Sequence, residues 1–265
     1  MKKIILFVAV IIYSQSMLAQ GLSAFEKQAF IRGKDTLRYR ILYPENYKPG
    51  KAYPVIMFLH GSGERGNDNE AQLIHGGDLF VKDSIRKINR AIVIFPQCPK
   101  DSTWSRFNRG TAGTERVFVK GLSATVPELM VKYLLDSLVE KKKINSKKIY
   151  LGGLSLGGMG TYDLVMKYPN YFEAAFHICG ACNVASFLEQ ASPLPLWIFH
   201  GSLENTVSPD PDRELYKLLM DKGAKKVTYT EYPGVKHNSW DNAFMEPGLI
   251  PWILSNKLPK KQASW

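Results

Sequence analysis

Seven short apolar runs, separated by longer polar or amphipathic stretches, constrain what this 265-residue chain can fold into. Several of them are apolar at nearly every position, which is typical of parallel strands covered by helices on both faces. The runs are RYRILYP (38–44), VIMFLH (55–60), AIVIFPQ (91–97), KIYLGGL (148–154), AAFHIC (174–179), LWIFHG (196–201) and VTYTEYP (227–233). They predict an α/β fold with a mostly parallel sheet.

Helical spacing of apolar residues appears between the runs, at 126–142 and at 212–222, where Gly223 ends the pattern. Strands that alternate with helices indicate a doubly wound sheet, which binds its ligands at the carboxyl ends of the strands. Two long connections, 61–89 and 98–125, leave that edge. We expect them to form the walls of a pocket.

The first twenty residues, MKKIILFVAVIIYSQSMLAQ, have the pattern of a secretory signal peptide. Two lysines precede an apolar run from Ile4 to Tyr13, which is far shorter than the roughly 20 residues needed to span a bilayer. We predict cleavage near Ala19 or Gln20 and a secreted or periplasmic chain that is not inserted in a membrane. Residues 21–265 have a length that suits one α/β domain.

The net charge of +11 falls to +9 when Lys2 and Lys3 leave with the signal peptide. The remaining basic residues are dispersed and form no basic-aromatic stripe of the kind that binds nucleic acid. They are therefore interpreted as solvated surface, and no nucleic-acid partner is expected.

Three cysteines are too few for a disulfide framework, and at most one internal disulfide can form. The Cys179-Gly-Ala-Cys182 spacing resembles a redox pair, but no helix signal follows it. Buried small residues at a strand end are the favoured interpretation.

Ser155 lies in Gly153-Leu154-Ser155-Leu156-Gly157, a G-x-S-x-G pattern that ends an apolar run and begins a helical one. A nucleophile elbow requires this strand-turn-helix setting, and its flanking glycines prevent steric clash around a strained serine. The alternative is a glycine-rich packing turn with an ordinary serine. We predict that Ser155 is a nucleophile.

A serine nucleophile needs a histidine base, and five histidines are available. His60 and His200 precede glycines at strand ends, His75 lies in a polar loop, and His177 lies within an apolar strand. His237 follows the last predicted strand in YPGVKHNSW. The chain order serine, acid, histidine favours His237 as the base.

The third member should be a carboxylate that fixes the imidazole tautomer. The last predicted strand, VTYTEYP (227–233), leads to His237, and LWIFHG (196–201) is the strand before it. Glu204 is the first acidic residue after LWIFHG. Asp210, near the start of the next helix, is the alternative.

Taken together, these motifs make the chain resemble the α/β-hydrolase superfamily, specifically the carbohydrate esterase family 1 and phospholipase/carboxylesterase-like group of secreted bacterial esterases. The resemblance covers nearly the whole mature chain and implies an α/β-hydrolase fold, Ser155 as nucleophile, His237 as base, and neither metal nor organic cofactor. Glu204 departs from the usual aspartate, although glutamate is accepted in the superfamily. The matching motifs are LHGSGERGNDN (59–69), FPQCP (95–99) with Trp104, GLSLGGMGTYDL (153–164), ICGAC (178–182), HGxxExxV (200–207) and YPGVKHNSW (232–240).

An oxyanion hole needs backbone donors beside the serine. The N–H of Leu156 is one, because that residue follows the nucleophile. Ser62, in the loop after VIMFLH, is our choice for the second donor, with Gly61 next. Glu64 and Arg65 are expected to form a structural ion pair in that loop.

The resemblance implies small-molecule or polysaccharide-linked esters as substrates, such as acetyl or feruloyl esters. Trp104 and Phe107, with Arg106 and Arg109, are candidates for the substrate-binding wall, and loop anchoring is their alternative role.

The family strand order also places Cys98 and Cys179 about three strands apart, roughly 14 Å, which exceeds the separation of about 7 Å that a disulfide tolerates. We predict no disulfide between them.

Two other functions remain open. A peptidase of the prolyl-oligopeptidase kind shares the fold and triad but usually carries an N-terminal propeller, for which this chain has too few residues before VIMFLH. A non-catalytic binding protein on a hydrolase scaffold is motivated only by Glu204 in place of aspartate.

Overall fold

The computed structural model describes residues 21–88, 90–109, 116–117, 121, 123–191 and 193–258. The signal peptide predicted for residues 1–20 lies outside these ranges.

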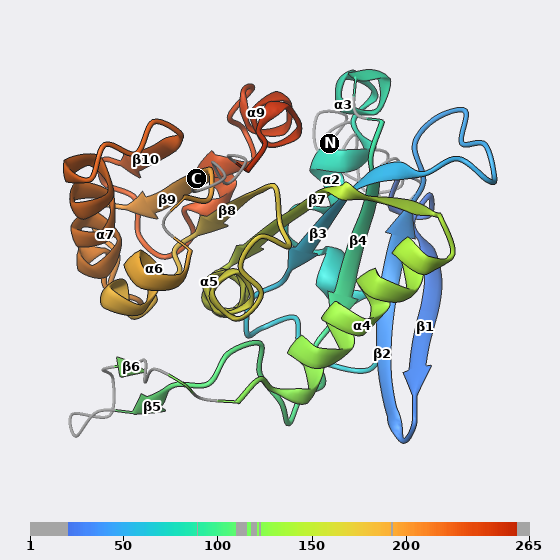
Figure 1. Cartoon of the computed structure of the whole chain (residues 1–265), viewed down its shortest axis with the longest axis horizontal. Coiled ribbons are helices and arrows are strands. Elements are labelled where there is room, and N and C mark those ends of the chain that lie inside the picture. The colour runs from blue at the N-terminus through green and yellow to red at the C-terminus, as the bar shows by residue number, and fades with distance from the viewer. Residues whose placement is uncertain are drawn as a thin grey trace, which may run out of the picture.

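An eight-stranded sheet with the order β1-β2-β4-β3-β7-β8-β9-β10 forms the centre of the structure (Figure 1). The pairs β1–β2 and β2–β4 are antiparallel, and every other neighbouring pair is parallel. The predicted mostly parallel sheet is therefore confirmed. Its strands are β1 (Glu26–Arg32), β2 (Asp35–Leu42), β3 (Tyr53–Leu59), β4 (Ile92–Gln97), β7 (Ile144–Leu154), β8 (Ala174–Ile178), β9 (Leu196–Gly201) and β10 (Val227–Tyr232).

All seven predicted runs are strands, and among the residues that the structure describes β1 is the one long strand that the pattern missed. Its residues are mostly exposed because it lies at the sheet edge, so it lacks the apolar pattern of a strand covered on both faces. A short pair, β5 (Asn108–Arg109) and β6 (Arg116–Val117), lies in the second long connection.

Helices cover both faces of the sheet. One face is covered by α4 (Val126–Glu140), α5 (Leu156–Lys167), α6 (Val184–Gln190) and α7 (Asp210–Asp221). The other is covered by η1 (Ala71–Leu73), α2 (Gly77–Val81), α3 (Asp83–Ile88), α8 (Trp240–Ala243) and α9 (Leu249–Ser255). No helix among the residues described here has the length and apolarity needed to cross a membrane.

The core has two layers because successive residues of each central strand point to opposite faces. In β3, Val55, Met57 and Leu59 join the cluster under α4 and α5, whereas Ile56 and Phe58 join the cluster under α2 and α9. Each of these side chains is fully buried, which stabilises the fold by about 1.5–3 kcal/mol per side chain.

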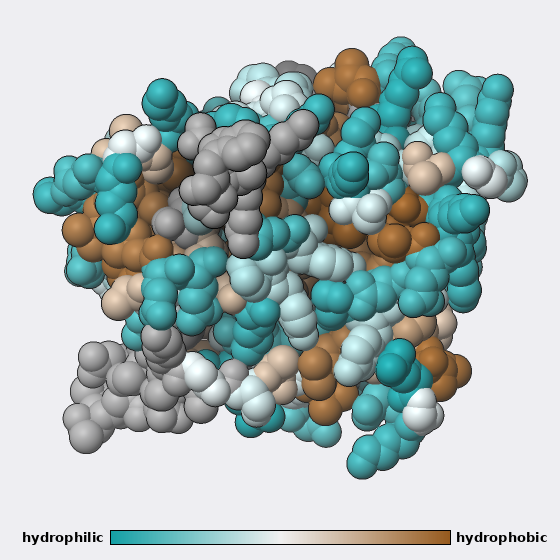
Figure 2. Space-filling model, in the orientation of Figure 1, coloured by the Kyte–Doolittle hydropathy of each residue, from teal (hydrophilic) through white to brown (hydrophobic). Residues whose placement is uncertain are grey.

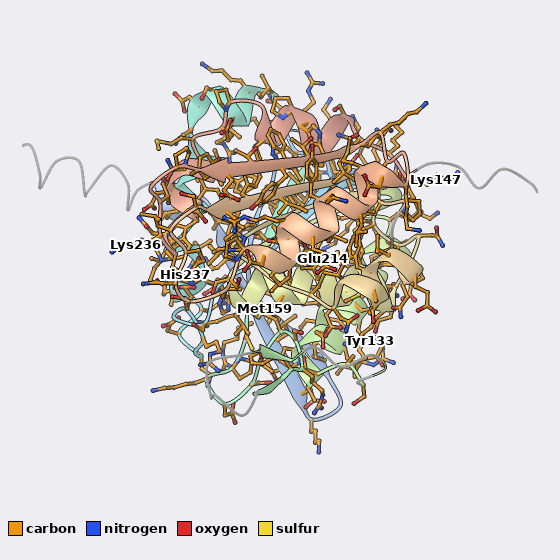
Figure 3. The ribbon with its side chains drawn as sticks, turned by 90° about the vertical axis from the view of Figure 1, so that its left-hand side faces the viewer. Tyr133, Lys147, Met159, Glu214, Lys236 and His237 are labelled. Carbon is orange, nitrogen blue, oxygen red and sulfur yellow. The ribbon has the colours of Figure 1, made fainter. Side chains whose placement is uncertain are left out.

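The carboxyl ends of the parallel strands meet at one edge of the sheet. Figure 3 shows His237 and Lys147, which lies early in β7, on opposite sides of the molecule. A functional site is therefore expected at the carboxyl edge.

The outer face seen in Figure 2 is mainly hydrophilic, and its apolar side chains form separate patches.

Candidate active site

Ser155 stands at the junction of β7 and α5 in a strained conformation, with φ 49° and ψ −113°. The junction is tight: a Cβ on Gly153 would lie 2.2 Å from the Gly157 carbonyl oxygen, and one on Gly157 would lie 2.0 Å from the Leu59 carbonyl oxygen. Only glycine fits at either position. This close packing holds the serine in a backbone conformation that it would otherwise avoid.

The Ser155 side chain faces His237. Its Oγ lies 3.0 Å from His237 Nε2, and His237 Nδ1 lies 2.7 Å from Glu204 Oε2. The Glu204 side chain has no exposed surface, the His237 side chain is 24% exposed, and Ser155 is 8% exposed. The three residues form a hydrogen-bonded chain with only its serine end and imidazole open to a substrate.

Glu204 is held by its own loop as well as by His237. Its Oε1 accepts hydrogen bonds from the backbone N–H groups of Thr206 (2.6 Å) and Val207 (3.2 Å). Burial alone would raise the pKa of Glu204, but the hydrogen bonds from His237, Thr206 and Val207 outweigh it and lower the pKa below its usual value. The carboxylate is therefore ionised beside the histidine at neutral pH.

Asp210, the alternative acid, points elsewhere. Its side chain is 76% exposed and binds Arg213 (2.7 Å) and the Ser208 hydroxyl (3.0 Å). Asp210 opens α7, so it acts at the helix N-terminus, and Glu204 is the carboxylate that reaches His237.

The predicted oxyanion donors lie on two sides of the serine. Leu156 is the first residue of α5, so its N–H lies at the positive end of the helix dipole. Gly61 lies against the nucleophile, since a Cβ on it would be 3.7 Å from Ser155 Cβ, and Ser62 follows at an exposed position. Within the described part of the chain, neither the Leu156 nor the Ser62 N–H has a protein acceptor.

The expected Glu64–Arg65 ion pair is wrong. Arg65 donates instead to the carbonyls of Ser62 (3.0 Å) and Ser102 (3.0 Å), while Glu64 is buried with its Oε1 3.6 Å from His75 Nε2. Arg65 thus bonds to backbone carbonyls on both sides of the loop, and Glu64 faces a histidine eleven residues further along the chain. Arg65 still braces the loop that carries Ser62.

The competing histidines have structural surroundings. His60 is buried between the Cys98 N–H and the Gly61 carbonyl, and burial lowers its pKa to about 4. His177 is also fully buried, and burial lowers its pKa to about 4. His75 packs on Trp240, which stands edge-on to His237. Sequence reasoning did not identify this aromatic contact, for which no motif exists.

Trp104 does not line an open wall, contrary to its expected substrate-binding role. Its side chain has no exposed surface, and its Nε1 donates to the His60 carbonyl (3.0 Å). The anchoring role fits this position, because a ring without exposed surface cannot touch a substrate. Phe107 is partly buried against the core, Arg106 is exposed, and the Arg109 side chain lies outside the described part.

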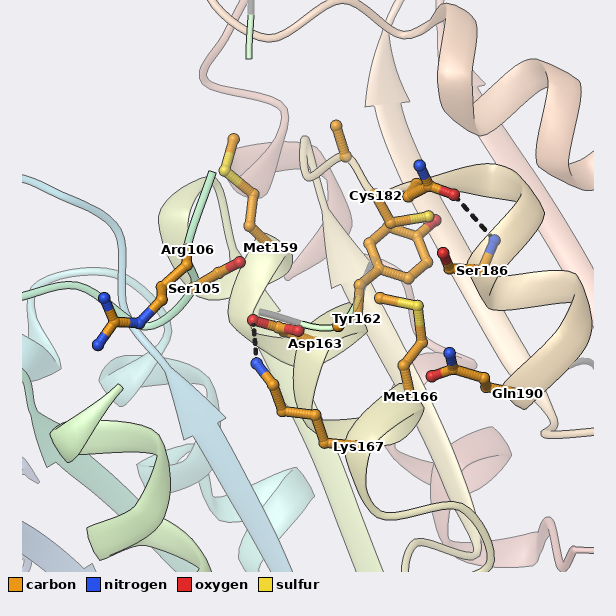
Figure 4. Close-up of a pocket in the computed structure, with 13 residues that line it drawn as sticks. Ser105, Arg106, Met159, Tyr162, Asp163, Met166, Lys167, Cys182, Ser186 and Gln190 are labelled. Carbon is orange, nitrogen blue, oxygen red and sulfur yellow. Dashed lines mark hydrogen bonds and ion pairs between the residues drawn. The ribbon is translucent and has the colours of Figure 1, made fainter. Parts of the chain in front are cut away.

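A cavity of about 100 Å³ lies between α5, α6 and the segment that carries Ser105 and Arg106 (Figure 4). In that view Met159, which lies four residues after the nucleophile, is near Ser105 and Arg106, and all three line the cavity. The other labelled lining residues are Tyr162, Asp163, Met166, Lys167, Cys182, Ser186 and Gln190.

The three cysteines are buried free thiols. Cys98 follows β4 and Cys179 follows β8, three strands away, as the disulfide argument expects. Burial raises the pKa of all three thiols, that of Cys98 to about 12. In the described ranges, the one cluster with metal-ligand geometry is Cys179, Glu204 and His237, and there the histidine and glutamate are already bonded to each other.

Sequence reasoning also missed two residues behind Glu204. His200 and Asp212 are both fully buried, and the His200 ring bridges Asp212 and the Val207 carbonyl. An aspartate in the first turn of a helix is normally a solvated residue, so no local signal indicated its burial.

The mostly parallel sheet, the strained serine between β7 and α5, and the serine–histidine–carboxylate chain define an α/β hydrolase. A model of the phospholipase/carboxylesterase family matches residues 46–247. The chain belongs to that family.

Known relatives are esterases by name. The bifunctional acetylxylan esterase/xylanase XynS20E of Neocallimastix patriciarum is 24% identical over 72% of this chain and 25% of its own length. Feruloyl esterase B of Thermothelomyces thermophilus is 33% identical over 53% of this chain and 44% of its own. The chain thus spans less than half the length of these relatives.

Among solved structures, a thermostable esterase is 31% identical, with a TM-score of 0.78 over 89% of this chain and 64% of that one. The likeness therefore covers most of this chain rather than the serine motif alone.

Proposed function

We propose that this protein is an exported serine esterase that hydrolyses carboxylic esters through an acyl-enzyme on Ser155. The observation that carries the proposal is the hydrogen-bonded chain from Ser155 Oγ through His237 to the Glu204 carboxylate. Export rests on the pattern of residues 1–20, and the mass of the exported chain, beginning at Gln20 or Gly21, tests it.

In the first half-reaction, His237 Nε2 takes the Ser155 hydroxyl proton while Oγ bonds to the ester carbonyl carbon. The carbonyl π electrons move to oxygen, and the N–H groups of Leu156 and Ser62 stabilise this oxyanion. Collapse of the intermediate breaks the ester C–O bond, and His237 gives its proton to the departing alkoxide. Glu204 holds the imidazole tautomer and stabilises the imidazolium form.

In the second half-reaction, water replaces the alcohol. His237 removes a proton from the water, hydroxide attacks the acyl carbon, and the new intermediate collapses with return of the proton to Ser155. The products are the carboxylic acid and the free serine, and no cofactor takes part.

Acetyl or feruloyl esters of polysaccharides are the proposed substrates. Support comes from the names of the relatives, an acetylxylan esterase/xylanase and a feruloyl esterase. The cavity beside α5 and α6 is the candidate site for part of the substrate, because its lining residue Met159 lies in the first turns of the helix that begins directly after Ser155.

A panel of acetyl, butyryl, long-chain and feruloyl esters tests the proposal on wild type and Ser155→Ala. Wild type should hydrolyse acetyl or feruloyl esters, and the substitution should lower kcat by at least about 10³-fold. A fluorophosphonate should label wild type once per chain and leave Ser155→Ala unlabelled. Hydrolysis that survives the substitution, or folded wild type that resists labelling, contradicts the mechanism, and cleavage of a proline-containing peptide favours a peptidase.

A further inference from the structure

His200 is the penultimate residue of β9 and lies beside the Glu204 carboxylate, and its side chain has no exposed surface. Its Nδ1 lies 2.8 Å from Asp212 Oδ2, and its Nε2 lies 3.0 Å from the Val207 carbonyl oxygen. The same Nε2 is 3.9 Å from Glu204 Oε2, the oxygen that binds His237. His200 therefore contacts the loop that positions the carboxylate and also stands beside the carboxylate itself.

Both hydrogen-bond partners of the His200 ring are acceptors. A carbonyl oxygen and an ionised carboxylate can each bond only to a ring nitrogen that carries hydrogen, so an ionised Asp212 and the Val207 carbonyl together require hydrogen on both nitrogens of His200. Burial would lower the pKa of His200, but the hydrogen bond and charge of Asp212, with Val207 and Glu204, outweigh it and raise the pKa.

His60, at the equivalent end of β3, shows the opposite arrangement. Its Nε2 accepts a hydrogen bond from the Cys98 N–H (3.0 Å), so that nitrogen carries no hydrogen, while Nδ1 donates to the Gly61 carbonyl (2.6 Å). His60 is thus a neutral imidazole in an equally buried place. Burial alone does not decide the charge of these rings, whereas the type of their partners does.

The other titratable groups around His200 come from four elements. On α7, Asp212 also accepts a hydrogen bond from the Tyr162 hydroxyl of α5 (2.7 Å). On β10, Glu231 pairs with His200 in the strand register, but its carboxylate is bound by Arg213 (2.9 Å) and by Tyr229 (2.5 Å). On β8, His177 Nε2 lies 3.6 Å from Asp212, and Cys182 after that strand is a neutral thiol.

We propose that His200 is a protonated positioning residue whose bond to the Val207 carbonyl fixes the Glu204 loop and whose positive charge balances the Glu204 carboxylate. Asp212, His200, Glu204 and His237 then form a row of alternating charge during catalysis, which begins in the core and ends at the partly exposed His237. The balance has a function because His237 must release its proton to the leaving alkoxide, which an uncompensated carboxylate would hinder. This inference rests on the proposed function.

Nitrogen NMR of protein labelled with ¹⁵N-histidine tests the charge on wild type near neutral pH. His200 should show two protonated ring nitrogens, and His60, the matched internal control, should show one protonated and one bare nitrogen. Resonances are assigned from His200→Gln and His60→Gln. One bare nitrogen on His200 would overturn the proposal. This measurement needs no turnover, so its result does not depend on whether the protein is an esterase. Fluorophosphonate labelling of Ser155 tests the proposed esterase function separately.

The pH dependence of kcat/KM in His200→Gln tests the consequence. Loss of the positive charge should stabilise the protonated form of the His237–Glu204 pair, so the acidic limb should move up by about one pH unit as kcat falls. If His200 only held the loop, a loosened Glu204 would leave that limb unmoved or move it down, and either result overturns the charge role. Asp210→Asn, at an exposed carboxylate, is the control and should leave the limb in place.

Discussion

Glu204 shows what an additional methylene does at the residue scale. Its longer side chain lets the two carboxylate oxygens serve different partners, with Oε2 on His237 and Oε1 on the backbone N–H groups of Thr206 and Val207. The backbone of the Glu204 loop therefore holds the carboxylate in place. The longer glutamate side chain still reaches His237, as the aspartate usual in such enzymes would.

Glu204→Gln should lower kcat by about 10³–10⁴-fold while the fold stays intact, because an amide neither fixes the histidine tautomer nor stabilises the imidazolium. Steady-state kinetics with a feruloyl or acetyl ester, together with circular dichroism, provide the measurement. Asp210→Asn is the matched control and should change kcat less than about twofold, since its carboxylate binds Arg213 on the surface. The reverse ranking would assign the acid to Asp210.

At the scale of elements, the junction of β7 and α5 depends on the absence of two side chains. Gly153 and Gly157 let the turn pack on itself and on the end of β3, at distances that leave no room for a Cβ. The strain at Ser155 is offset by this packing, so the sequence G-x-S-x-G specifies a geometry as well as a nucleophile.

Gly153→Ala should lower the free energy of unfolding by about 3 kcal/mol or prevent folding, because the new methyl group would meet the Gly157 carbonyl at 2.2 Å. Urea denaturation followed by fluorescence gives the value. Gly63→Ala is the control: a Cβ there meets nothing within 4 Å, so its stability should stay within about 0.5 kcal/mol of wild type. Equal stabilities of the two variants would show that the junction can relax.

Across the whole molecule, buried histidines couple stability to pH. His60 and His177 are neutral in the folded state, where burial lowers each pKa to about 4, against an unfolded value of about 6.5. Their stabilising contribution is complete above the unfolded pKa and is lost as the pH falls toward the folded pKa. The raised pKa of His200 acts in the opposite sense, because its contribution is present at low pH and lost as the pH rises.

Each of the two lowered histidines should reduce the free energy of unfolding by about 2 kcal/mol between about pH 7 and pH 5. The raised pKa of His200, and that of Glu128, which burial raises to about 8, act in the opposite direction over the same range. Urea midpoints at the two pH values measure this. His177→Phe should weaken the dependence, because it removes one of the two groups from a site packed on Tyr162. An unchanged dependence in this variant would assign the acid sensitivity to other groups.

Local patterns were enough to predict much of this protein. The apolar runs predicted seven strands, and the serine motif predicted the turn between β7 and α5. The serine motif selected Ser155, and the positions after the last two predicted strands selected Glu204 and His237. The fold brings these three residues within hydrogen-bond distance, and their roles stay predictions until tested. These features depend on a few neighbouring residues, so the sequence contains the necessary information.

Only the tertiary structure decided which partners distant side chains meet. β1 was missed because it lies exposed at a sheet edge. Trp104, predicted to line the substrate-binding wall, is fully buried, and Glu64 pairs with His75. The charge of His200 depends on Asp212 and Val207, two acceptors that packing brings to opposite sides of one ring. The spacing of residue types along the chain determines which segments form strands, helices and turns. Burial and pairing between these elements arise only when helices and loops cover the faces of the sheet.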